Sequence, residues 1–125
     1  MLNTKAAPTD DIHVRRAMAF ATDYDSIVND IFIGSKRATG PVVLGMTAAA
    51  LTEEDMPYEF NLEKAEEELK QSKYYDQLIS GEIPISFVWC TEGGLQQEKL
   101  ALFFQASMAK IGVKVEITGK TFATM

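Results

Sequence analysis

The sequence predicts an α/β fold in which helices accompany a βαβ unit with a small parallel sheet. The stretch "IPISFVW" (Ile83 to Trp89) is rich in β-branched and aromatic residues, which predicts a strand. A helical pattern follows from about Gln96 to Ile111, with large apolar residues on one side, and Gly112 is placed to end it. "VKVEIT" then alternates apolar and polar residues as a second strand does. Strand, helix and strand in this order predict parallel strands joined by a crossover.

Three helices are expected before this unit. Asp11 is an N-cap candidate for a helix from about Ile12 to Ala21, because apolar residues fall there at i, i+3, i+4 and i+7. Thr22 and Asp23 offer a second cap, for a helix that repeats the same spacing up to Phe32 and ends at Gly34. Asn61 offers a third, for the charged surface helix "LEKAEEELKQS". The apolar positions of the first helix are Val14, Ala17, Met18 and Ala21.

Helical periodicity is lost between Gly34 and Tyr58, where glycines and prolines punctuate the chain. Long irregular connections are uncommon in compact domains and are often functional, so this stretch is interpreted as a wrapping segment. A sheet of only two parallel strands normally needs cover on both faces and further neighbours. The sequence therefore predicts one domain over residues 1–125 that is a fragment of a larger protein.

Composition excludes several function classes. With 125 residues and 46% hydrophobic residues, the chain has enough apolar side chains for one folded core. The net charge of −6, with scattered lysines and arginines, opposes binding to nucleic acid. No stretch is long and apolar enough for a membrane span, and the first residues lack the pattern of a secretory signal. The lone Cys90 forms no internal disulfide.

Catalytic and metal sites are not indicated. His13 and Cys90 are the only residues of their types, and a nucleophile pair would have to use both without an orienting third group. We expect His13 to be a surface residue at a helix start and Cys90 to be a small buried hydrophobe. The acidic runs "EED" and "EEE" lack the spacing of a calcium loop, so neither a metal nor a cofactor is expected.

The turn "TEGG" (Thr91, Glu92, Gly93 and Gly94) is the main candidate site, because it joins a strand to a helix N-terminus. Backbone N–H groups at such a turn attract anions such as a carboxylate. A plain connecting turn fits the same residues. Ligands in open α/β sheets bind beyond the carboxyl ends of parallel strands, which is where this turn lies.

Four segments in unbroken order resemble the extracellular solute-binding proteins, family 5, the peptide-binding components of ABC importers. They are "LNTKAAPTDDIHVRRAMAFATDYDSIV", "TGPVVLGM", "YEFNLEKAEEELKQS" and "EKLALFFQASMAKIGVKVEI". Members of the family are longer and built from two lobes that close on a ligand. The resemblance implies the type II periplasmic-binding-protein fold, with this chain as part of lobe two.

The resemblance also implies a function. The parent protein would be a non-enzymatic, extracytoplasmic protein, periplasmic or a surface lipoprotein, that binds a peptide or related solute in the cleft between lobes. It would then deliver the solute to an ABC permease. The implied cleft-side residues are Gly40 and Pro41 and the turn Thr91 to Gly94. Dipeptide-binding members carry a basic residue in that turn, whereas Glu92 stands here and would repel a carboxylate.

Two other interpretations stay open. A standalone interaction domain derived from such a lobe would use its exposed cleft face for a protein partner or a second copy, since severed lobes expose apolar surface. A hydrolase that uses Cys90 or Glu92 would require turnover that is lost on Cys90→Ala or Glu92→Gln.

Overall fold

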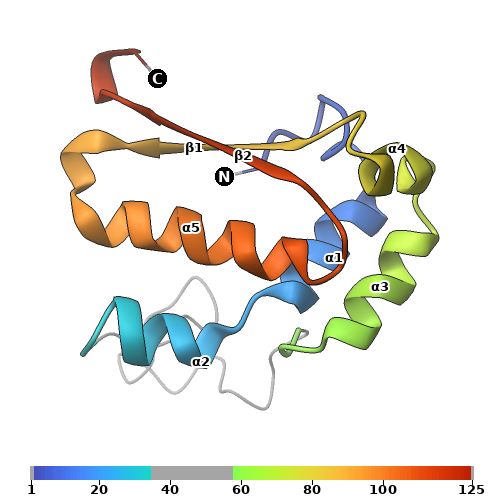
Figure 1. Ribbon diagram of the computed structural model, residues 1–125, viewed down its shortest axis with the longest axis horizontal. Coiled ribbons are helices and arrows are strands. Elements are labelled where there is room, and N and C mark those ends of the chain that lie inside the picture. Colours follow the sequence, from blue (N-terminus) through green and yellow to red (C-terminus); the bar gives the residue numbers. More distant parts are fainter. Residues whose placement is uncertain (1, 35–57, 125) are drawn as a thin grey trace, which may run out of the picture.

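The computed structural model describes residues 2–34 and 58–124 of the chain. Its elements are α1 (Ile12–Ala21), α2 (Tyr24–Ser26), a π-helical turn η1 (Ile27–Ile31), α3 (Leu62–Lys70), α4 (Tyr75–Ser80), β1 (Ile85–Cys90), a 3₁₀ turn η3 (Thr91–Gly93), α5 (Leu95–Ala109), β2 (Val115–Lys120) and a 3₁₀ turn η4 (Phe122–Thr124). Figure 1 shows α5 lying between the sheet and the α2–η1 segment, with α1 and α3 packed beyond one end of α5. The α/β fold with a small parallel sheet is confirmed.

The two strands pair in parallel, as the order strand, helix, strand predicted. Ile85 lies opposite Val115 at one end of the pair, and Cys90 lies opposite Lys120 at the other. Burial alternates over the first four residues of both strands, so that one face packs toward α5 and the other faces solvent. The outward residues Ser86, Val88, Glu116 and Thr118 are exposed.

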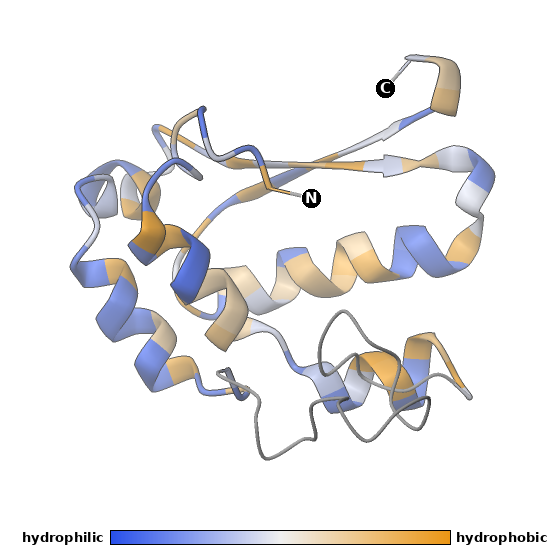
Figure 2. Ribbon diagram, turned by 180° about the vertical axis from the view of Figure 1, so that it is seen from behind, coloured by the Kyte–Doolittle hydropathy of each residue, from blue (hydrophilic) through white to orange (hydrophobic). Residues whose placement is uncertain are grey.

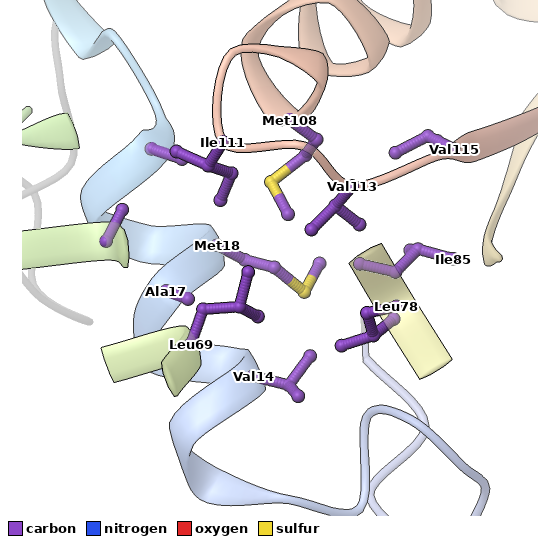
Figure 3. Packing of buried hydrophobic residues seen from close by; sticks show 12 residues of the cluster. Val14, Ala17, Met18, Leu69, Leu78, Ile85, Met108, Ile111, Val113 and Val115 are labelled. Atoms are coloured by element: carbon purple, nitrogen blue, oxygen red, sulfur yellow. The ribbon is translucent and has the colours of Figure 1, made fainter. Parts of the chain in front are cut away.

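The core forms where α1, α3, α4, α5 and the starts of both strands meet. Figure 3 shows its apolar side chains converging from all of these elements. The four positions predicted for α1 are all buried, and Met108, Ile111 and Val113 meet them from the end of α5 and the connection to β2. Figure 2 shows α3 as mostly hydrophilic and the middle of α5 as mostly hydrophobic, which fits their surface and interior positions.

Side-chain caps begin the helices α1 and α3, and a glycine ends α5. The Asp11 carboxylate accepts from the His13 N–H at 2.8 Å, and Asn61 caps α3 by accepting from the Lys64 N–H. Gly112 ends α5 in the left-handed region at φ 81°. The Gly112 N–H donates to Ala109 and the Val113 N–H donates to Met108, the pattern of a Schellman motif. The caps and the glycine stop were predicted from sequence.

Several boundaries differ from expectation. The strand predicted from Ile83 begins at Ile85, because the Ile83 N–H donates to the Gln77 carbonyl of α4 and Pro84 has no N–H to donate. The strand predicted from Val113 begins at Val115, because the Val113 N–H is used by the helix end. The helix expected to extend to Phe32 is α-helical only over Tyr24–Ser26 and continues as the π-helical turn η1.

Two further differences concern α4 and the long connection. The helix α4 was not predicted, since it is short and its N-terminus has no side-chain cap. The predicted wrapping segment lies largely outside the described residues.

A polar cluster ties the N-terminus of α1 to the α3–α4 junction. The second Asp11 oxygen accepts from the Ser72 hydroxyl at 2.9 Å and from the Lys73 N–H at 3.3 Å. Burial raises the pKa of Asp11, but these bonds and the His13 N–H outweigh it and leave the pKa below the ordinary 3.8. The other end of the helix pair is joined by the Asn61 N–H, which donates to the Phe20 carbonyl at 2.8 Å. The pair α1 and α3 is therefore fixed at both ends.

Replacing Asp11 by Ala should lower the free energy of unfolding by about 2 kcal/mol, because an N-cap and two hydrogen bonds to a carboxylate are lost together. Asp25→Ala, at an exposed position in the first turn of α2, is the matched control and should cost less than about 0.5 kcal/mol. Urea denaturation of the chain measures both changes. Equal losses for the two variants would contradict the role given to Asp11.

Candidate functional site

The carboxyl ends of β1 and β2 meet at one edge of the sheet, because the strands are parallel. Cys90 pairs with Lys120 in the last register position, so η3 follows one strand directly beside the residues that lead into η4. Figure 1 shows both turns at the same end of the molecule. All four predicted residues of the turn, Thr91 to Gly94, are exposed there. The other two predicted positions, Gly40 and Pro41, lie outside the described residues.

Two glycines allow this edge to pack closely. A Cβ on Gly93 would lie 2.1 Å from the Gln97 side-chain carbon Cδ, so only glycine leaves room for that side chain as it stands. Gln97 in turn accepts the Cys90 N–H with its Oε1 at 3.3 Å. On the facing strand, a Cβ on Gly119 would lie 3.1 Å from both the Trp89 ring and the Thr91 methyl group. The residues Thr91 to Gly94 therefore pack against β2 and against the N-terminal residues of α5.

Glu92 connects the two turns. Its carboxylate accepts the Phe122 N–H with both oxygens, at 3.2 Å and 3.0 Å, and accepts the Cys90 thiol at 2.9 Å. The bond from the Cys90 thiol, together with those from the backbone N–H groups of Glu92 and Phe122, holds the pKa of the Glu92 carboxyl below its ordinary 4.5. Glu92 is therefore ionised at neutral pH, and its carboxylate already accepts hydrogen bonds from Cys90 and Phe122 within the site.

The helix α5 begins beside this carboxylate. Gly94 occupies the N-cap position at φ 74°, and no side chain caps the helix. The positive end of the helix dipole thus lies at the same edge as the negative charge of Glu92. Leu95, the first residue of α5, is 71% exposed, so the edge also presents apolar surface.

Sequence reasoning found the turn but missed its partners. Phe122, Gln97 and Lys120 complete the edge, and Lys120 accepts the Thr91 hydroxyl with its carbonyl at 3.5 Å. The predicted parallel pairing indicates that the residues after β2 lie at the same edge as Thr91, but it does not indicate which of them reaches the turn. Phe122 lies 30 positions from Glu92, beyond the reach of any local spacing rule.

The residues considered for nucleophilic catalysis have separate partners. His13 Nδ1 lies 2.8 Å from the Glu68 carboxylate, which links α1 to α3, whereas the Cys90 thiol donates to Glu92. His13 is partly exposed near the start of α1, as expected. Cys90 is half-buried and hydrogen-bonded, so the expectation of a buried hydrophobe was wrong.

The described residues, 2–34 and 58–124, contain neither a metal cluster nor a membrane-spanning helix. No group of three or more His, Cys, Asp or Glu side chains is placed to hold a metal ion there. No helix in the same ranges has the length and apolar character needed to cross a membrane.

The fold and the edge define the class of protein. The structure aligns with the PBP AgaA from A.tumefacien R10, solved with agropinic acid, at a TM-score of 0.75 and 25% identity over 99% of this chain and 24% of that one. It also aligns with the periplasmic binding protein DppA from Helicobacter pylori, solved with the peptide STSA, at a TM-score of 0.69 and 29% identity over 98% of this chain and 22% of that one. The chain therefore has the fold of part of a periplasmic binding protein.

The family follows from the sequence match. Residues 1–125 match the model of the bacterial extracellular solute-binding proteins, family 5 Middle, and the chain belongs to this family. It is 31% identical over 125 residues to the probable D,D-dipeptide-binding periplasmic protein DdpA of Escherichia coli (strain K12), covering 99% of this chain and 22% of that protein. The chain spans about a fifth of the length of the curated relatives that it matches. Solute-binding proteins are transport components rather than enzymes, which confirms the non-enzymatic expectation.

Gly93→Ala should lower the free energy of unfolding by about 1 kcal/mol, because Gln97 must swing away and release the Cys90 N–H. In a Gln97→Ala background the same substitution should cost much less, since the obstructing side chain is gone. Urea denaturation of the two single variants and the double variant gives the coupling energy directly. A cost for Gly93→Ala that is the same in both backgrounds would contradict the close approach described here.

Proposed function

We propose that this chain is part of lobe two of a solute-binding protein of an ABC importer, with the edge formed by Thr91 to Gly94 facing the cleft between the lobes. The protein binds a peptide or a related small solute and delivers it to a membrane permease. In this proposal the chain takes part in binding and catalyses no reaction.

The observation that carries the proposal is the whole-chain family match combined with the position of the turn. The turn lies beyond the carboxyl end of a parallel strand and at the N-terminus of α5. Ligands of open α/β sheets bind at such edges. The exposed backbone of Gly94, with no atom within 4 Å of where a Cβ would stand, offers a peptide or a carboxylate a close approach that a bulkier residue would block.

Relatives support a peptide as the first solute to test. DdpA is named as a probable D,D-dipeptide-binding protein, and the DppA structure contains the peptide STSA. AgaA was solved with agropinic acid, so a small solute that is not a peptide is the second class. Peptides are commonly held through main-chain hydrogen bonds, which a lobe edge built from glycines suits.

The proposed location and partner follow from the same relatives. DdpA is a periplasmic protein by name, and we extend this to an extracytoplasmic location for the protein that contains this chain. A permease is the partner implied for a solute-binding component of an ABC importer.

A second candidate function is a standalone interaction or dimerisation domain. It is favoured by the outer face of the sheet, which is exposed along both strands and includes Val88 at 40% exposure, and by the exposed side chains of Leu95 and Phe122 at the edge. Exposed apolar side chains such as Val88, Leu95 and Phe122 favour association with a partner or a second copy.

Isothermal titration of the whole protein that contains this chain, with peptides of two to five residues and with small organic acids, tests the proposal. We expect binding of at least one solute. Thr91→Arg should change its affinity by about tenfold or more, because a long cation then stands at the cleft edge. The matched control is Ser80→Arg, at an exposed position at the end of α4, which should leave the affinity unchanged.

The results distinguish the importer function from the position proposed for the turn. Absence of binding to every solute, together with concentration-dependent dimerisation of this chain in sedimentation, would overturn the importer function in favour of the interaction domain. Solute binding that is equally insensitive to both arginine substitutions would preserve the function but contradict the position given to the turn.

A further inference from the structure

The two turns at the carboxyl edge are joined mainly through one side chain. The Glu92 carboxylate receives the Phe122 N–H on both oxygens, at 3.2 Å and 3.0 Å. A longer hydrogen bond of 3.5 Å, from the Thr91 hydroxyl to the Lys120 carbonyl at the end of β2, also lies at this edge. Bonds to an ionised acceptor are stronger than bonds between neutral groups, so Glu92 makes the stronger connection.

The turn after β2 needs such an anchor. Its other hydrogen bonds lie within the turn itself, from the Thr124 N–H to the Thr121 carbonyl at 3.0 Å and between the two threonine side chains. Those bonds shape the turn but do not fix its position on the sheet. The N–H that Glu92 binds belongs to Phe122, whose side chain is 81% exposed, so the anchor also places an apolar ring at the edge.

Cys90 supports the same arrangement from the strand. Its thiol donates to Glu92 Oε2 at 2.9 Å, and its backbone N–H is held by Gln97 of α5. The carboxylate is therefore positioned by β1 and α5 before it reaches across to the turn after β2. These hydrogen bonds form a continuous series from the first helical turn of α5 to Phe122.

We propose that Glu92 is a positioning residue that holds the turn after β2 against the turn after β1, so that the two form one rigid edge of the solute cleft. The existence of a cleft rests on the proposed function. The connection between Glu92 and the Phe122 N–H, called the tether below, is a property of this chain alone. It differs from the sequence-based expectation that Glu92 acts on a solute carboxylate by direct repulsion.

Amide hydrogen exchange of this chain, measured by NMR, tests the tether without any solute. Glu92→Ala should speed exchange at Phe122 by about tenfold, since its acceptor is removed. Glu92→Gln should speed it less, because the amide oxygen still accepts that N–H and the amide nitrogen can donate to the Cys90 sulfur. The control Glu116→Ala removes the same charge from an exposed position on β2 and should leave Phe122 unchanged. Unchanged exchange in Glu92→Ala would overturn the tether.

Titration of the whole protein with its solute separates positioning from direct contact. If Glu92 is a positioning residue, Glu92→Ala should weaken binding several-fold and Glu92→Gln should retain most of the affinity. The loss of affinity in Glu92→Ala should be equal for N-acetylated peptides and for peptides with a free amine. If Glu92→Ala and Glu92→Gln lost the same affinity, and only for peptides with a free amine, Glu92 would form an ion pair with the solute and the proposal would be overturned. If no solute binds, the proposed function fails while the exchange result still decides the tether.

Discussion

The parallel pairing of β1 with β2 is the constraint on which the rest of this structure depends. It requires a crossover, which α5 supplies, and α5 in turn covers one face of the sheet and brings Met108 into the core. It also brings the ends of both strands to one edge. An antiparallel pair would have put the residues after Cys90 and those after Lys120 at opposite ends, where Glu92 and Phe122 could not meet.

The helices α1 and α3 brace this unit from one end. Their contact is fixed by Asp11 at the α3–α4 junction and by the Asn61 N–H at the opposite end. His13 and Glu68 add a third connection across the pair. These ties lie away from the carboxyl edge of the sheet, so they hold the helices together without using the residues proposed to face the solute.

Local signals made much of the fold predictable. The two caps Asp11 and Asn61 and the helix stop Gly112 fulfil these roles within a few residues of their own position, and the sequence indicated all three correctly. The shifted strand starts have one cause: the backbone N–H groups at Ile83 and Val113 are used by neighbouring helix ends, which no alternation of side chains records. The predicted turn was in the right place for the same local reasons. Its connection to Phe122 was not predictable, because it depends on the register of two strands separated by α5.

The most direct test of the central claim is a crystal structure of the whole protein that contains this chain, with a bound solute. The account predicts that the solute lies between two lobes and touches the edge formed by Gly93, Gly94 and Phe122. A solute bound elsewhere, with that edge open to bulk solvent in the closed protein, would contradict it.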